Sequence, residues 1–366
     1  MVKLPFSESE MEIVSTVPNF RLPDAPEIPI FKYPITPKEA VLAAVSNEPV
    51  WCLYGTESRS FSPKIIPDNV ARGFLVEKDP LPSERFGGLD MFGVEWEYVP
   101  LVGGSMVRPG NPLMTDANDW EKVIRFPSKA EIDTWGWENS AKENEEFLKN
   151  GKANYVWLQN GCWFERLISF MDVENACIAL IDEEQKDAVK ALFERTTELF
   201  CYIVDKFCQS YGDGFAGFTV HDDWGTQRAP FFSFDVGREM FVPYMRKLTD
   251  HIKSKGKIAD LHSCGKSEIH APNFVEAGWQ IWCPMPMNDT ALLHEQYGDK
   301  ILIHVCDELF GDDATDEQQY ARGEDFARRF CTPGKPVAVN GIYCPQLLTP
   351  EFCKGLYKES RRIFGS

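Results

Sequence analysis

Short apolar runs alternate along the chain with longer segments in which apolar residues recur at helical spacing. A short run bounded by turn residues is typical of a buried strand, and a period of three to four residues is typical of a helix with one face against a core. The eight apolar runs occupy residues 49–54, 93–102, 155–159, 215–220, 257–261, 280–283, 301–305 and 336–339. The clearest helical periods cover residues 183–210, 239–255 and 316–331.

This alternation predicts the α/β class. Strands that alternate with helices form a parallel sheet, because parallel neighbours need a crossover connection between them. Eight such units in one chain favour a closed (β/α)8 TIM barrel over an open doubly wound sheet. We therefore expect a single barrel domain over residues 49–366, preceded by an N-terminal extension.

The extension, residues 1–48, contains too many prolines for a long helix. They include Pro18, Pro23, Pro26, Pro29, Pro34 and Pro37. Their spacing predicts an arm that lies across the surface of the domain. A short helix is expected after Pro37, because proline is well placed in the first turn of a helix. Residues 61–153 show few helical periods, and we expect an elaborated loop region over one face of the barrel.

Composition and charge narrow the classes of partner. With 38 Lys+Arg against 56 Asp+Glu, the formal net charge is −18, which argues against nucleic acid or an anionic membrane surface as a partner. No apolar run approaches the roughly 18–20 residues of a membrane span, and the N-terminal residues lack the apolar core of a secretory signal. Eleven cysteines without such a signal indicate a reducing compartment, and the cytoplasm is the expected location.

The strongest local signal is the pair His262 and Cys264, which directly follows the apolar run 257–261. Alternate residues of a strand face the same way, so these two side chains are expected to emerge together. An imidazole nitrogen and a thiolate side by side suit a soft divalent metal, zinc first. Gly265 then allows a sharp turn into the next loop.

Cys344 follows the last predicted strand and supplies a candidate third ligand. The carboxyl ends of all barrel strands open on one face, so Cys344 can converge on His262 and Cys264. One His and two Cys ligands would leave an open coordination position, the usual arrangement for catalytic zinc. Cys162 and Cys306 also stand at strand ends and are alternatives to Cys344. The remaining cysteines are expected to be buried apolar residues.

Two further groups of polar residues follow strands. In the first, His221 and Asp223 follow the run 215–220 and are candidate catalytic groups, while Trp224 and Gln227 are candidates to contact the substrate. Asp223 is alternatively an acceptor behind the metal or a metal ligand. The competing interpretation is a helix cap at Asp222 or Asp223 beside a buried Trp224.

The second group follows the run 155–159 and contains Trp163 and Glu165. Glu165 is a candidate fourth metal ligand, or else a surface carboxylate in the first turn of a helix with Arg166 beside it. Trp163 and Tyr343 join the candidates for substrate contact, because several aromatic residues lie near the predicted barrel mouth and suit stacking on a ring. Phosphate-binding glycine loops and the motifs of zinc proteases and serine hydrolases are absent from the sequence.

Taken together, these segments resemble the uroporphyrinogen decarboxylase superfamily, and more closely its zinc-dependent, corrinoid-linked methyltransferase branch. The resemblance covers roughly residues 150–366. It is carried by the order and spacing of residues 222–227 (DDWGTQ), 241–248, 255–257, 261–265 (LHSCG), 275–278, 340–345 (NGIYCP) and 349–351. The first 150 residues match poorly. They lack the arginine-rich segment of true uroporphyrinogen decarboxylases, and those enzymes lack the H-x-C pair, which argues against porphyrinogen decarboxylation here.

The resemblance implies a (β/α)8 barrel with zinc held by His262, Cys264 and Cys344. It also implies transfer of a methyl group from a methoxylated, aromatic small molecule to the Co(I) corrinoid of a partner protein. The alternative within the branch is transfer from the methyl-corrinoid protein to tetrahydrofolate or a thiol. An alternative of another class is a decarboxylase-like lyase or a barrel without methyltransferase activity.

Overall fold

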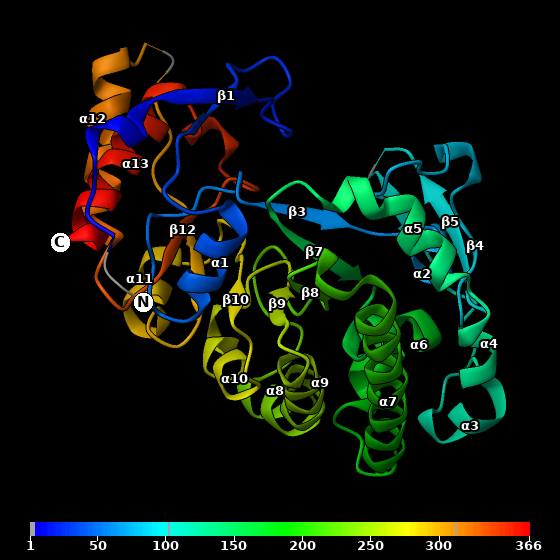
Figure 1. Cartoon of the computed structure of the whole chain (residues 1–366). Coiled ribbons are helices and arrows are strands. Elements are labelled where there is room, and N and C mark those ends of the chain that lie inside the picture. The colour runs from blue at the N-terminus through cyan, green and yellow to red at the C-terminus, as the bar shows by residue number, and fades with distance from the viewer. Residues whose placement is uncertain (1–3, 102, 312) are drawn as a thin grey trace.

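Seven parallel strands form one curved sheet in the computed structural model, which describes residues 4–101, 103–311 and 313–366 (Figure 1). Their order is β12–β11–β10–β9–β8–β7–β3. The strands are β3 (Ser58–Phe61), β7 (Ala153–Leu158), β8 (Gly217–His221), β9 (Ile258–His262), β10 (Ile281–Trp282), β11 (Leu302–Val305) and β12 (Val337–Val339). The chain is an α/β protein with a TIM-barrel-like fold.

One segment of the chain contacts both edges of this sheet. Leu53 forms a parallel bridge with Ala338 of β12, and the N–H of Val339 donates to the carbonyl of Leu53 at 2.7 Å. Five residues later the same segment enters β3, which pairs with β7. The sheet is thereby curled into a barrel, and the predicted run 49–54 contributes a single bridge rather than a full strand.

The six predicted runs after residue 150, from 155–159 to 336–339, coincide with the barrel strands β7 to β12. The run 93–102 was assigned wrongly to the barrel, and its last residue, Val102, lies outside the described residues. Residues Glu95–Val99 form β5, which pairs antiparallel with β4 (Gly88–Leu89) and β6 (Gly104–Met106). The pattern is that of a strand with one buried face, since Trp96 is buried while Glu95 and Glu97 are exposed.

Helices cover the outside of the barrel (Figure 1). The three predicted helical segments correspond to α7 (Lys186–Tyr211), α9 (Val242–Ser254) and α12 (Asp316–Phe330). The others are α1 (Pro37–Val45), α2 (Pro67–Arg72), α3 (Trp120–Val123), α4 (Lys129–Asp133), α5 (Trp137–Leu148), α6 (Phe164–Ala179), α8 (Phe234–Met240), α10 (Ala271–Glu276), α11 (Thr290–Tyr297) and α13 (Pro350–Gly365). The helix expected after Pro37 is confirmed, and Thr36 caps it. None of the described helices is both long and apolar enough to cross a membrane.

The region between residues 61 and 153, expected to be an elaborated loop region, contains the small sheet β4–β6 and the helices α2 to α5. A buried ion network fastens this region to the start of α6. The guanidinium of Arg166 donates to Asp90 at 2.9 Å and to Asp68 at 2.5 Å, and all three side chains are at least 98% buried. Asp90 in turn accepts the backbone N–H groups of Phe92 and Val94.

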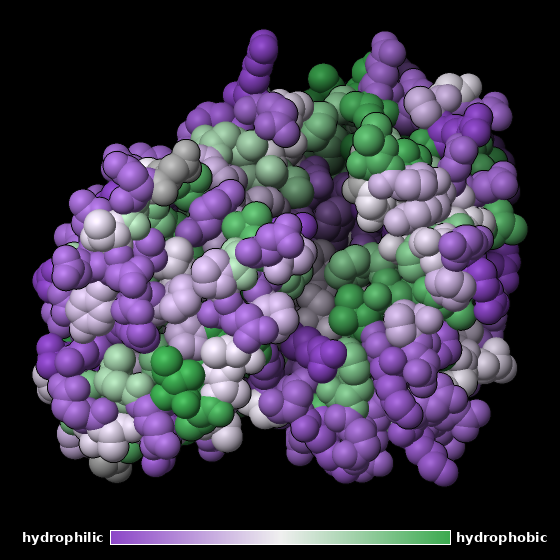
Figure 2. Space-filling view, turned by 90° about the horizontal axis from the view of Figure 1, so that it is seen from above, coloured by the Kyte–Doolittle hydropathy of each residue, from purple (hydrophilic) through white to green (hydrophobic). Residues whose placement is uncertain are grey.

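The N-terminal arm contains an antiparallel pair, β1 (Ile13–Val17) with β2 (Ile28–Phe31), and contacts the last helix. Glu10 accepts hydrogen bonds from Arg361 at 2.7 Å and from Tyr357 at 2.9 Å, both on α13. The arm and α13 lie on the same side of the molecule (Figure 1). Seen from above, the surface is hollowed near its middle, and apolar residues gather along one side of the hollow (Figure 2).

Candidate functional site

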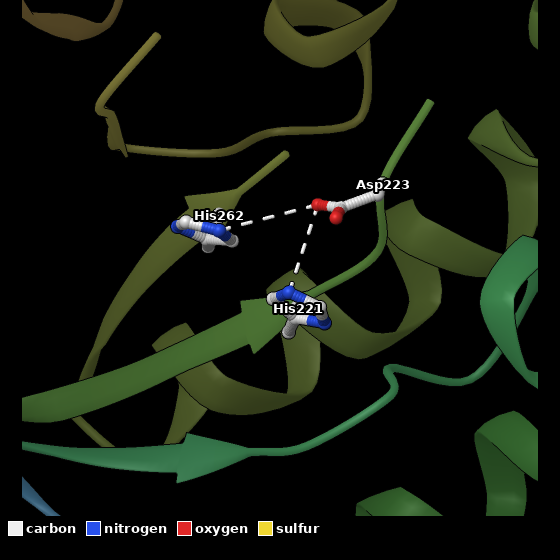
Figure 3. Close-up of side chains that lie close together, drawn as sticks. All are labelled: His221, Asp223 and His262. Carbon is white, nitrogen blue, oxygen red and sulfur yellow. Dashed lines mark ion pairs between the residues drawn. The ribbon is translucent and has the colours of Figure 1, made fainter. Parts of the chain in front are cut away.

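Two histidines end neighbouring strands and face one carboxylate. His221 is the last residue of β8 and His262 the last of β9, and the two are paired in register. Asp223 follows β8, and its Oδ1 lies 3.6 Å from Nε2 of His221 and 4.0 Å from Nε2 of His262 (Figure 3). The imidazole rings stack with centroids 4.8 Å apart. One potential ligand atom from each residue lies within 4.8 Å of the others, so the group is a candidate metal site.

The surroundings shift the pKa values of the two histidines in opposite directions. Burial opposes a charge on His221, but the carboxylates of Glu165 and Asp223 outweigh it, and the pKa of His221 is raised. Burial, reinforced by the charge on His221, lowers the pKa of His262 to about 3. His262 is therefore a neutral imidazole, the form that offers a lone pair to a metal.

Cys264 lies beside this group. Its Sγ is 3.1 Å from Nε2 of His262, which confirms that the two side chains of the H-x-C pair emerge together. The backbone N–H of Cys264 donates to Asp223 Oδ1 at 2.6 Å, and the hydroxyl of Tyr343 lies 3.7 Å from its sulfur. Burial, with Asp223 nearby, raises the pKa of the Cys264 thiol to about 12, so a thiolate there requires a cation.

Cys344 was expected to form a compact ligand set with His262 and Cys264, but it contacts another cysteine instead. Its Sγ lies 2.7 Å from Sγ of Cys306, and it does not belong to the His221, Asp223 and His262 group found among the described residues. Cys162, the other alternative, is fully buried, and its carbonyl accepts a hydrogen bond from Thr196 of α7. The assignment of Cys264 and Cys344 as metal ligands stays a prediction.

Glu165 contacts one member of the three-residue group, His221, and is not itself part of that group. Its carboxylate pairs with Nδ1 of His221 and lies 3.8 Å from the guanidinium of Arg72. A carboxylate on the second nitrogen of an imidazole fixes the tautomer and orientation of the ring. Arg72 belongs to α2, in the region that showed no interpretable pattern, and no sequence signal pointed to it. A direct ligand role for Glu165 stays a prediction.

Asp222 positions Glu165 from behind. It accepts the backbone N–H groups of Phe164 and Glu165, at 3.3 and 3.0 Å, and the indole N–H of Trp224 at 2.7 Å. These contacts cap the start of α6, a helix from an earlier part of the chain. The alternative of a helix that begins at Asp222 or Asp223 is wrong, because the next helix, α8, begins at Phe234. Burial, together with the charge of Glu165, raises the pKa of Asp222 to about 7.

The residues expected to contact a substrate fall into two groups. Trp163 and Trp224 have no exposed surface and pack between the barrel and its helices, which does not fit a wall in contact with a substrate. Gln227 is exposed in a loop closed by the bridge between Gly225 and Pro230. Tyr343 is half-buried beside Cys264.

A cavity of about 110 Å³ lies inside the barrel, one layer below the two histidines. Thr219 and Asp260, two residues before His221 and His262, both line it and are paired in register. The hydroxyl of Thr219 donates to Asp260 at 2.5 Å, and burial raises the pKa of this carboxyl to about 7. The indole of Trp157 lines the cavity and lies 5.3 Å from the ring of His262.

The loops that carry the site touch through two glycines. A Cβ on Gly265, whose φ is +82°, would lie 2.0 Å from the carbonyl oxygen of Gly225. Only glycine permits this approach, because a side chain at either position would collide with backbone. The contact holds the loop that carries Asp223 against the loop that carries Cys264.

A similar solved structure is that of a methyltransferase from Methanosarcina mazei. It has a TM-score of 0.54 and 14% sequence identity, and the match covers 88% of this chain and 97% of that one. At this identity the likeness shows the shared fold. A structure of Dispersin B, with 10% identity over 90% of this chain and 94% of its own, has a TM-score of 0.31, too low to bear on the fold. No protein-family model and no curated protein matches the chain.

Proposed function

We propose that this protein is a zinc-dependent methyltransferase. In this proposal it moves a methyl group from a methoxylated, aromatic small molecule to the Co(I) corrinoid of a partner protein in the cytoplasm. The observation that carries the proposal is the convergence of His262, Asp223 and Cys264 at the carboxyl ends of neighbouring strands. The fold shared with a methyltransferase and the sequence resemblance of residues 150–366 are consistent with it.

The donor set fits zinc when Cys264, next to His262, takes the place of His221 in the three-residue group. His262 offers a neutral imidazole nitrogen, Asp223 a carboxylate oxygen, and Cys264 a sulfur whose charged form a dication would stabilise. Cys344 is the further ligand that the resemblance implies. When bound, zinc polarises the oxygen of an ether so that it can leave as an alkoxide or phenolate.

The protein's own residues supply proton control and orientation. His221 is held between Glu165 at Nδ1 and Asp223 near Nε2, the surroundings of an imidazole that carries a proton. Its Nε2–H can pass a proton to the departing oxygen, while Glu165 stabilises the ring from the other side. Asp223 also accepts the N–H of Cys264, which holds the thiol next to His262.

Corrinoid chemistry requires access from outside. The transferred methyl group must reach a cobalt carried by another protein, and the carboxyl ends of barrel strands are open to such an approach. The cobalt supplies the redox chemistry, so this chain has to supply placement and polarisation only.

The first experiment measures zinc in anaerobically purified protein. We expect about one ion per chain in the wild type and in His251→Ala, and a large loss in His262→Ala. His251 is the matched control because it forms an ion pair with Asp205 on α7, away from the site. Zinc-free wild-type protein, with His262→Ala fully active, would overturn the proposal.

The second experiment mixes the protein with a reduced corrinoid protein and a panel of methoxyarenes. Formation of methyl-Co(III), followed by its absorbance, is the expected result. Demethylation of the methyl-corrinoid protein by tetrahydrofolate or a thiol, with no response to any methoxyarene, would instead establish the reverse direction.

A further inference from the structure

Two free thiols meet at the barrel mouth. Cys306 directly follows β11, and Cys344 follows β12, the next strand of the sheet. Their sulfurs lie 2.7 Å apart, although both cysteines are free. A disulfide bond has a sulfur–sulfur length of about 2.05 Å, so only a small movement separates this contact from a bond.

The backbone on both sides of the pair is anchored. The N–H of Cys306 donates to the hydroxyl of Thr290 at 2.9 Å, and the N–H of Cys344 donates to the carbonyl of Asn340 at 2.9 Å. Asn340 also binds the carbonyl of Pro284 through its side-chain amide, which ties the loop after β12 to the loop after β10. The thiols are therefore held together by the fold rather than by chance rotation of their side chains.

Neighbouring cysteines are less suited to react with either thiol. Cys283 lies near both, but its thiol donates to the amide oxygen of Asn340 at 3.4 Å. Cys264 faces His262 and Tyr343. Cys306 is partly exposed, so a small oxidant can reach the pair from solvent.

We propose that Cys306 and Cys344 form a reversible disulfide on exposure to hydrogen peroxide. One thiol sulfur attacks the peroxide oxygen, becomes a sulfenic acid and releases water. The second sulfur then attacks the sulfenic sulfur and displaces a second water, so two thiols and one hydrogen peroxide give one disulfide and two waters. A dithiol reverses the step by exchange.

The disulfide would act on the proposed zinc site, and this consequence rests on the proposed function. Cys344 is a predicted zinc ligand, and a sulfur bonded to Cys306 is no longer available as a thiolate. Oxidation therefore lowers zinc occupancy, and bound zinc in turn slows formation of the disulfide.

The test treats the full-length protein, reduced and freed of zinc by a chelator, with a small excess of hydrogen peroxide. Thiol titration is expected to fall by two per chain, from the eleven cysteines present to nine, and to recover with dithiothreitol. Peptide mapping without reductant should recover a peptide that links Cys306 to Cys344. Linkage to Cys283 instead, or irreversible oxidation of Cys306 without a link, would overturn the proposal.

Two variants sharpen the result. Cys306→Ser should abolish the linked peptide, whereas Cys177→Ser, at a partly exposed cysteine of α6, should leave it unchanged. Repeating the reaction with added zinc separates this inference from the proposed function. If the disulfide forms equally fast with and without zinc, the cysteine pair stands and the assignment of Cys344 as a zinc ligand fails.

Discussion

The buried Arg166 offers the sharpest test of how the region before β7 is held to the barrel. Replacing it with methionine keeps most of the side-chain volume and removes the positive charge. Asp68 and Asp90 then remain buried opposite each other, because Arg166 is the cation paired with both among the described residues. The same two carboxylates accept hydrogen bonds from the backbone N–H groups of Met91, Phe92 and Val94. The substitution is therefore expected to weaken these hydrogen bonds as well.

The expected cost follows from this geometry. Removing one partner of a buried ion pair costs about 3–5 kcal/mol, since it leaves an uncompensated buried charge. For 366 residues, an unfolding entropy near 2.1 cal/mol/K per residue gives about 0.8 kcal/mol/K. Arg166→Met should therefore lower Tm by about 4–6 °C.

Differential scanning calorimetry measures this shift, with Arg362→Met as the matched control. Arg362 pairs with Glu8 at 3.1 Å, but its side chain is 46% exposed, so its loss should cost less than about 1 kcal/mol. The triple variant Asp68→Asn, Asp90→Asn and Arg166→Met should recover part of the loss, because no buried charge is left unpaired. Equal Tm shifts for Arg166→Met and Arg362→Met would refute the reasoning.

Three further predictions concern the surroundings of the site. Asp222→Asn leaves one acceptor oxygen for three N–H donors. It should therefore lower the free energy of unfolding, measured by urea titration, by about 1–3 kcal/mol. Unchanged stability would show that Asp222 does not cap α6. Burial lowers the pKa of His270 from 6.5 to about 4, so folding favours its neutral form. Between pH 7 and pH 5 the free energy of unfolding of the wild type should therefore fall by about 2 kcal/mol relative to that of His270→Gln, and a difference that does not change with pH would contradict a buried neutral imidazole. In the same titration, Gly265→Ala should lower the free energy of unfolding by at least about 2 kcal/mol more than Gly110→Ala does. Both glycines have positive φ, but only a side chain at position 265 would collide with Gly225. Equal losses of stability would exclude the contact.

Most of the barrel was predictable because its central strands are buried on both faces and read as continuous apolar runs. The strand β3 escaped detection because Ser58, Arg59 and Ser60 are polar, and they line the cavity inside the barrel. The segment of β5 was wrongly predicted to be a barrel strand, because its alternating pattern was taken for an apolar run. Glu95 and Glu97 alternate with Trp96, a period that indicates one exposed face and hence an antiparallel strand outside the barrel.

The site was predictable where residues directly continue a strand. His221, Asp223, His262 and Cys264 do so, and side chains two residues apart emerge on the same face. The same period places Trp224 on the opposite face, where it is buried, so the expectation that it lines a substrate pocket neglected the alternation. Arg72 reaches the site from a segment whose path no local pattern specifies.

The closure of the barrel has a consequence for the order in which the chain folds. Leu53 finds its partner strand only when β12 has been synthesised, and Glu10 finds Arg361 only with α13. Contacts between residues so distant in sequence slow folding, because a long loop must close before they form. Until then one edge of the nascent sheet stays unpaired, and unpaired strand edges promote aggregation. We therefore expect refolding yield to fall steeply with protein concentration, while the closed barrel, once formed, no longer offers that edge.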